Sequence, residues 1–178
     1  MKEEKPEENK LLGEKGELKS ISFLKNKNWG VTTQRADLIG YLSHDEDREV
    51  CGEWIKSDEA IRIEVRTRSR LMNPPPYWAV GLEEKDLLKY ERFYERTKMK
   101  TLIVVPVLDD ENNSEGIFGA FFLQWLHVLL RVPKDKFFYR AGRAGRFKNI
   151  NVDQFKYKIF GENLSLVLKS LMLKDEDN

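Results

Sequence analysis

The sequence predicts an α/β domain in which a central mixed β-sheet is flanked by helices. Three stretches carry this prediction. In residues 61–67 every second residue is β-branched, which is typical of a strand with one face in a core. Residues 82–99 have apolar side chains at helical spacing. Residues 101–108 form a nearly continuous apolar run, as expected of a strand that is covered on both faces.

Length and composition set the limits of the prediction. The chain has 178 residues, of which 34% are charged and 40% hydrophobic, typical of a globular protein. We expect a flexible, charge-rich segment at residues 1–12 and a single domain at residues 13–178. No apolar run approaches the ~20 residues that span a bilayer, and the start lacks the apolar core of a secretion signal, so we expect a cytoplasmic protein without a membrane segment. The single cysteine, Cys51, excludes an internal disulfide, and no Cys/His cluster indicates zinc.

The first part of the chain is predicted to form one helix and several short strands. Residues 14–26 have an apolar face, with glutamates near the start where the helix dipole favours acids. Residues 31–42 are rich in β-branched and aromatic residues and are predicted as one or two strand pieces, with Asp37 in the middle. Residues 51–55 are predicted to form another short strand before the strand at residues 61–67.

The second part of the chain contains a basic region. Residues 73–76 are Asn-Pro-Pro-Pro and end the strand region, because proline cannot continue a ladder or a helix. Residues 116–132 are apolar, and we predict a strand up to Leu123 and leave the remainder open. Residues 131–158 hold nine basic and two acidic residues, a local charge of +7 in a chain whose net charge is +1. Residues 162–173 have helical spacing and are predicted to dock on the core.

Polar residues alternate with the β-branched residues of the strand at 61–67. Glu64 and Arg66 therefore point the same way, about 7 Å apart along the strand. An acid and a base held side by side can bind a metal and a phosphate together. The alternative is a solvated strand face that carries a cross-strand salt bridge. Asp37 is the unusual residue of its own strand-like run, since strands are depleted in aspartate.

The order of these elements resembles that of the PD-(D/E)XK nucleases, the restriction-endonuclease-like superfamily. In that family a first-helix glutamate joins some sites, an aspartate follows on the next strand, and a Glu-x-Lys pair comes on the strand after it. The resemblance covers roughly residues 14–108 and implies a restriction-endonuclease-like core. Residue by residue, Glu17 takes the helix position, Asp37 the aspartate position and Glu64 the acid of the pair. Arg66 stands where the lysine is expected.

The resemblance also implies a chemistry. Residues 64–69, Glu-Val-Arg-Thr-Arg-Ser, look like the acid-x-Lys-Thr-x-Ser strand end of that family with one exchange. Asp37 and Glu64 would hold Mg²⁺ or Mn²⁺, which polarises the scissile phosphate and activates a water. Arg66 suits contact with the phosphate through its planar fork, but it stays protonated and cannot act as a base. The exchange therefore leaves phosphate binding intact and leaves catalysis open.

A second candidate feature is the basic segment Arg-Ala-Gly-Arg-Ala-Gly-Arg at residues 140–146. Arginine at every third position, with glycine between, suits close approach to a polyanion, and such phosphate contacts bind without reading sequence. The alternative is an exposed loop on a nearly neutral protein. The candidate nucleic-acid-binding residues are Arg68, Arg70, Arg140, Arg143, Arg146 and Lys148.

The leading hypothesis from the sequence is a metal-dependent endonuclease that cleaves DNA phosphodiester bonds. Its site would comprise Asp37, Glu64, Arg66 and Glu17, with DNA as partner, and the resemblance allows a homodimer. One alternative is a catalytically inactive nucleic-acid- or protein-binding module on the same fold. Another is a structural assembly protein whose charges form only a solvated surface.

Overall fold

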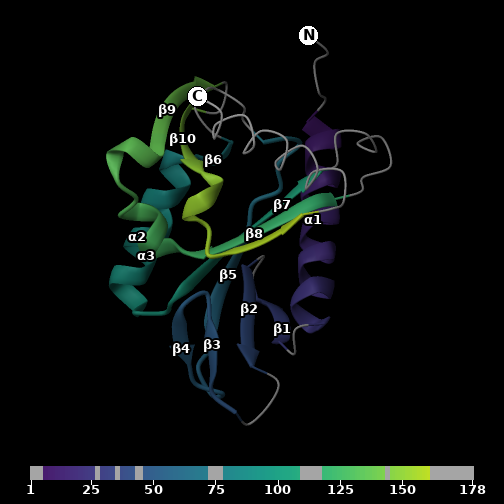
Figure 1. The fold of residues 1–178 in the computed structure, drawn as a ribbon. Helices are drawn as coiled ribbons and strands as arrows, with labels where there is room; N and C mark the ends of the chain where they lie inside the picture. The colour runs from purple at the N-terminus through teal and green to yellow at the C-terminus, as the bar shows by residue number, and fades with distance from the viewer. Residues whose placement is uncertain are drawn as a thin grey trace, which may run out of the picture.

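The computed structural model describes residues 6–26, 29–34, 37–42, 46–71, 78–108, 118–142 and 145–160. Within these residues the chain forms a mixed α/β structure with a helix layer on each face of a central sheet (Figure 1). Helix α1 (Pro6–Asn26) covers one face, and helices α2 (Glu84–Thr97) and α3 (Leu126–Leu130) cover the other. The predicted α/β class with a central mixed sheet is confirmed.

The central sheet has six strands. In sheet order they are β1 (Trp29–Gln34), β2 (Asp37–Leu42), β5 (Ile61–Val65), β7 (Thr101–Leu108), β8 (Phe118–Trp125) and β11 (Tyr157–Phe160). Neighbouring strands are antiparallel except β5 and β7, which run parallel. Helix α2 lies in the connection between these two parallel strands, since a parallel pair cannot be joined by a tight turn.

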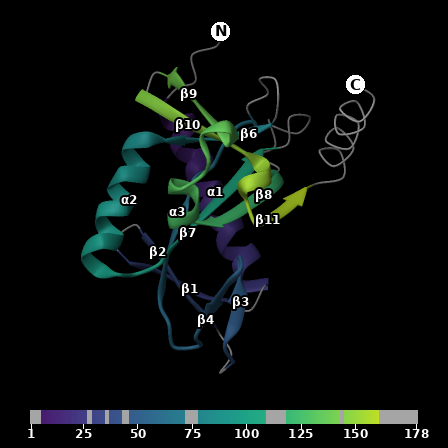
Figure 2. The ribbon, with the colours of Figure 1, turned by 60° about the vertical axis from the view of Figure 1, so that its left-hand side comes forward.

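Two smaller sheets complete the described structure (Figure 2). Strands β6 (Ala79–Glu83), β10 (Gly145–Asn151) and β9 (Phe137–Gly142) form an antiparallel sheet in that order. Strands β3 (Arg48–Val50) and β4 (Glu53–Ile55) form a hairpin. Cys51 and Gly52 join this hairpin with φ values of 50° and 84°, the left-handed geometry of a tight two-residue turn. Short 3₁₀ turns lie at Lys134–Lys136 and Val152–Gln154.

The core follows from the alternation along the central strands. In β7, Leu102 and Val104 pack on the side of α1, while Ile103 and Val105 pack on the side of α2 and α3. Every residue of β7 is buried, so the prediction of a strand covered on both faces is confirmed. In β5, Ile61 and Ile63 also belong to the α1 side. Val65 packs against the same cluster, so Arg62 and Glu64 are the residues of β5 that point toward α2.

Several boundaries differ from the predictions. Helix α1 begins at Pro6 and therefore includes much of the segment expected to be flexible. Residues 79–83, partly assigned to the second helix, form β6 instead, because β10 offers them a partner strand. The open part of residues 116–132 passes from strand to helix at Leu126. No helix in the described ranges is long and apolar enough to cross a membrane.

Two predictions lie outside the described residues. These are the proline-rich stop at residues 73–76 and the final helix at residues 162–173. The basic region at residues 131–158, by contrast, is largely described. Most of it is the hairpin of β9 and β10, which the sequence did not indicate because its apolar and polar residues alternate poorly.

Candidate functional site

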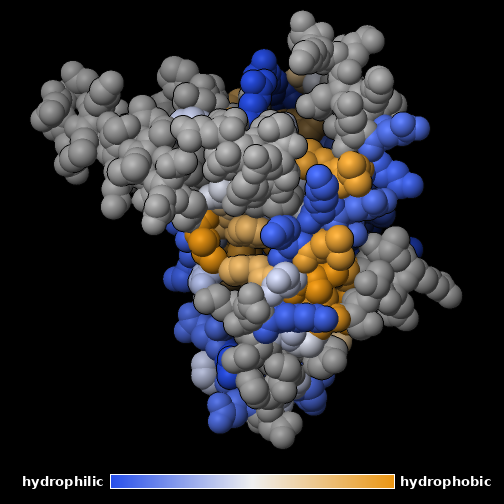
Figure 3. Space-filling view, turned by 90° about the vertical axis from the view of Figure 1, so that its right-hand side faces the viewer, coloured by the Kyte–Doolittle hydropathy of each residue, from blue (hydrophilic) through white to orange (hydrophobic). Residues whose placement is uncertain are grey.

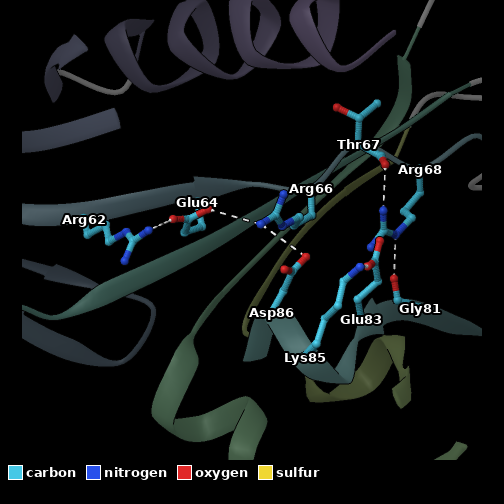
Figure 4. A network of polar contacts seen from close by, with 9 residues as sticks. All are labelled: Arg62, Glu64, Arg66, Thr67, Arg68, Gly81, Glu83, Lys85 and Asp86. Atoms are coloured by element: carbon cyan, nitrogen blue, oxygen red, sulfur yellow. Dashed lines mark hydrogen bonds and ion pairs between the residues drawn. The ribbon is translucent and has the colours of Figure 1, made fainter. Parts of the chain in front are cut away.

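The polar face of β5 lies beneath α2 and is buried. Arg62 is 3% exposed and Glu64 is 7% exposed. The Arg62 guanidinium forms an ion pair with Glu64 Oε1 (Figure 4). The same guanidinium lies 4.3 Å from the ring centroid of Phe93 and 5.1 Å from that of Tyr90. The interpretation of this strand face as solvated, with a cross-strand salt bridge, is therefore wrong: the ion pair runs along the strand and water is largely excluded.

Arg66 follows Arg62 and Glu64 on the same side of the chain and lies closer to the surface. Its Nη2 lies 3.6 Å from Glu64 Oε2 and 3.3 Å from Asp86 Oδ2, so it is shared between a strand carboxylate and a helix carboxylate. Its side chain is 30% exposed, far more than Arg62 or Glu64. Glu64 and Arg66 do point the same way, as the period of two predicts. Figure 4 shows the row from Arg62 through Glu64 and Arg66 to Asp86.

Asp37 is the first residue of β2, the strand beside β5. The register pairs Leu38 with Ile63 and Ile39 with Arg62, and opposite residues share one face of a sheet. Continuing that register by one residue sets the backbone of Asp37 opposite that of Glu64. The Asp37 side chain lies outside the described part of the structure. The two acids of the predicted site are thus neighbours in backbone position.

Glu17 is not brought to this site. It is exposed on α1, the helix that covers the opposite face of the sheet. Beside it, Gly16 packs so closely on Thr67 that a Cβ added at Gly16 would overlap Thr67 Oγ1. The sheet therefore separates Glu17 from the polar face that carries Glu64. The resemblance assigned Glu17 to the site from its position in the first helix. Because α1 begins at Pro6, Glu17 lies in the middle of that helix and not near its start.

Two predicted nucleic-acid-binding residues have internal partners instead. Arg68 donates from Nε to the Gly81 carbonyl and from Nη1 to the Thr67 carbonyl, which ties the end of β5 to β6. Burial, and then the nearby charge of Arg66, lowers the pKa of Arg68. Lys148 is 6% exposed. Both residues are thus engaged within the described structure. Their contacts with nucleic acid stay predictions, as does that of Arg70, which is exposed.

Lys148 has a specific structural task. Its Nζ donates to the Leu129 carbonyl at 2.9 Å and to the Leu130 carbonyl at 3.3 Å, at the C-terminal end of α3. Cations at this end of a helix satisfy carbonyls that lack partners in the helix. The ammonium also lies 4.3 Å from the ring centroid of Phe137, and burial lowers the pKa of Lys148.

The basic hairpin keeps two exposed arginines. Arg140 is exposed on β9, and Arg146 on β10 is 58% exposed. The Arg146 guanidinium lies 3.6 Å from the ring centroid of Tyr139, and its Nε is 3.8 Å from Glu84 Oε2. Partial burial, and then the nearby Glu84 carboxylate, raises the pKa of Tyr139. Arg143, at the tip, lies outside the described residues.

Sequence interpretation missed the residues that connect these two regions. Asp86 and Glu84 both belong to the first turn of α2, where acids usually indicate only the helix dipole. In the structure Asp86 contacts Arg66 and Glu84 contacts Arg146. Arg62 was also missed, because its role depends on the aromatic residues of α2. The spacing of Tyr90 and Phe93 on one helix side was the only available signal.

Comparison with known proteins does not assign this chain to a family. No family model matches it, and no curated protein sequence matches it. The function is therefore argued from the geometry of the described residues.

The donor set around Glu64 does not fit a divalent metal in this arrangement. Oε1 of Glu64 is paired with Arg62 and Oε2 faces Arg66, so both carboxylate oxygens already face a guanidinium. Among the residues that the structure describes, no group of three His, Cys, Asp or Glu side chains is placed to share a metal ion. A metal at this point requires a rearrangement of the arginines.

A separate cavity of about 190 Å³ lies on the α1 side of the sheet. Figure 3 shows that side of the molecule, where hydrophobic side chains gather between hydrophilic ones. Cys51 lines the cavity, and its Sγ lies 3.8 Å from the Leu123 carbonyl. Burial, and then the Glu53 carboxylate, raises the pKa of Cys51 to about 12. Cys51 is thus a protonated, packed thiol. The remaining cavity residues are Phe23, Leu24, Trp29, Arg48, Glu49, Val50, Leu123 and Tyr157.

Proposed function

We propose that this protein binds the phosphate backbone of DNA along a basic strip made of Arg66, Lys85 and Arg146, with Tyr139 beside Arg146. One observation carries the proposal. The first turn of α2 contacts Arg66 through Asp86 and Arg146 through Glu84. The first turn of α2 therefore carries carboxylate partners for two basic groups that lie far apart in the sequence.

The side chains of the basic strip suit a polyanion. Lys85 is 65% exposed and Arg146 is 58% exposed, so both are accessible. Water screens the ion pair of Arg146 with Glu84 near the surface, so a phosphate can displace the Glu84 carboxylate. Guanidinium groups bind phosphate oxygens in a bidentate way. Tyr139 is 40% exposed and offers a ring on which an unpaired base can stack.

The element order supports the same proposal. Helix α1, the antiparallel strands β1, β2 and β5, helix α2 and the parallel strand β7 occur in the order that the sequence resemblance implies for a restriction-endonuclease-like core, with β3, β4 and β6 inserted among them. We include that core in the proposal. A cytoplasmic location stays a prediction.

Salt-dependent binding tests the proposal. We expect fluorescence anisotropy with a labelled DNA duplex to show affinity that falls with salt. The variant Arg146→Ala should bind more weakly, and its log–log salt slope should be shallower by about 0.9 for each phosphate that the variant no longer neutralises. Arg92→Ala, at an exposed position of α2, is the matched control and should bind as the native chain does. Equal weakening in both variants, or binding that ignores salt, would overturn the proposal.

A second candidate is metal-dependent cleavage of DNA phosphodiester bonds. It is favoured by the register that sets Asp37 opposite Glu64. It requires a cation to displace at least one guanidinium from Glu64. Incubation of supercoiled DNA with Mg²⁺ or Mn²⁺ should then yield nicked DNA for the native chain and none for Asp37→Ala or Glu64→Ala. Cleavage that survives both substitutions would remove this candidate. Sedimentation of the same samples tests the predicted homodimer.

A further inference from the structure

Arg62 lies beside Glu64 where a metal ion would have to bind. We propose that Arg62 is the permanent counter-ion of Glu64 and takes the place of a divalent cation, so that this carboxylate binds neither Mg²⁺ nor Mn²⁺. The ion pair between Arg62 and Glu64 Oε1 is the starting point. It joins two buried side chains of one strand, which are 3% and 7% exposed.

The Arg62 guanidinium is almost entirely covered by the described residues. The ring of Phe93 lies 4.3 Å from it and the ring of Tyr90 lies 5.1 Å from it, both from α2. Strand β5 is held between β2 and β7, so the backbone of Arg62 cannot turn away either. Breaking a buried ion pair leaves an uncompensated charge, which is strongly unfavourable. A cation that competes with Arg62 for Glu64 must overcome that penalty.

The other oxygen of Glu64 offers no better access. Oε2 faces Arg66 at 3.6 Å, so two positive side chains already act on one carboxylate. Mg²⁺ takes octahedral coordination and keeps several of its waters. An ion with such a shell can reach Glu64 only if it displaces a guanidinium from one of the two carboxylate oxygens.

This inference does not depend on DNA binding by the basic strip, because Arg62 is buried and takes no part in that strip. It does bear on the second candidate function. If Arg62 holds Glu64 permanently, a metal-dependent cleavage step at Glu64 is excluded, and the site acts through its arginines alone.

The test uses the full chain and Mn²⁺, whose free form is measured by electron paramagnetic resonance. We expect the native chain and Glu64→Gln to bind Mn²⁺ equally, because any binding comes from surface acids. Glu95→Gln, at an exposed position of α2, serves as the matched control for such surface binding. Mn²⁺ binding that disappears in Glu64→Gln and persists in Glu95→Gln would overturn the inference.

The second part of the test looks for a gain of Mn²⁺ binding in a variant that lacks Arg62. Arg62→Met removes the charge and keeps a long apolar stem against Phe93. We expect its thermal midpoint to fall and to recover in part with Mn²⁺, and we expect no recovery in Arg62→Met/Glu64→Gln. An unchanged midpoint without metal, or no recovery with Mn²⁺, contradicts the proposed role of Arg62. The first part of the test needs no Arg62 variant, so it decides the question even if Arg62→Met fails to fold. Loss of DNA binding alone would leave this inference standing.

Discussion

Strand β5 presents two chemically opposite faces, and both are buried. Toward α1 it carries Ile61 and Ile63, which are 0% and 1% exposed. Toward α2 it carries Arg62 and Glu64, which are 3% and 7% exposed. Alternation along a strand tells which residues share a face, but it does not tell whether water reaches that face. Here a helix covers the polar face, so its charges must neutralise one another.

The two faces stabilise the fold in different ways. The isoleucines contribute in proportion to the apolar area removed from water, and each contributes on its own. The charged residues contribute only as a set, because each one buried alone would be strongly unfavourable. The following predictions test this difference, from the largest expected effect to the smallest.

The largest effect is expected on the polar face. Arg62→Met should lower the free energy of unfolding by about 3–5 kcal/mol, because it leaves the Glu64 carboxylate buried beside one partner fewer. Arg62→Met/Glu64→Leu should lose far less, because both charges are then gone. Urea unfolding measures both variants. A double variant as unstable as the single one would show that the pair does not act as a unit.

On the α1 side of the sheet, burial and not an ion pair sets the pKa of a titratable group, the Cys51 thiol. The pKa of Cys51 is raised from 9.0 to about 12, so at pH 8 its thiolate fraction is about a thousandfold below that of a free thiol. Alkylation by iodoacetamide should slow accordingly and reach normal rates in urea. This raised pKa makes the free energy of unfolding depend on pH. Below pH 9 the thiol is protonated in both the folded and the unfolded chain, so it has no effect. The free energy of unfolding falls as pH rises from 9.0 toward about 12, because the unfolded chain loses the proton first. Rapid alkylation of the folded chain at pH 8 would contradict the assignment.

A smaller effect is expected from a subtle change on the apolar face. Ile63→Val removes one methylene and should cost about 0.5–1.5 kcal/mol, with the urea m-value unchanged. This loss is a fraction of that for Arg62→Met, although the two side chains are neighbours on one strand. A loss as large as that of Arg62→Met would mean that the two faces are not energetically distinct.

The smallest effect on stability is expected at the surface. Glu84→Gln removes the carboxylate beside Arg146, at a distance of 3.8 Å in an exposed setting. The free energy of unfolding should change by less than about 1 kcal/mol, because exposed ion pairs contribute little. DNA affinity at low salt should rise, since Arg146 no longer has a competing anion. A large loss of stability, or weaker DNA binding, would contradict the role given to Glu84.

Much of the fold was predictable because its signals are local. The period of two in β5, the apolar run of β7 and the helical spacing of α2 each follow from a few neighbouring residues. The boundary between β6 and α2 was not predictable in this way. Strand β6 pairs with β10, which follows it by many residues, and a partner that distant leaves no mark in a local pattern.

The site was predictable only in part for the same reason. The common direction of Glu64 and Arg66 follows from their spacing. The strand that begins at Asp37 lies beside β5, while the role of Asp37 in a site stays a prediction. Lys148 could not be distinguished from the exposed bases around it, because its burial depends on the carbonyl end of α3. Asp86 could not be chosen among the acids of α2, because only the position of the helix over β5 selects it.

The close approach of Gly16 to Thr67 restricts which sequences can share this architecture. Any larger residue at Gly16 would meet the stiff, branched side chain of Thr67 and lift α1 off the sheet. Distant relatives of the chain should therefore combine a glycine in the middle of the first helix with the pattern Arg-x-Glu-x-Arg-Thr on the third strand of the central sheet. Sequences can be searched for this combination. It differs from the Glu-x-Lys pair of the PD-(D/E)XK nucleases in having an arginine on each side of the acid and no lysine after it.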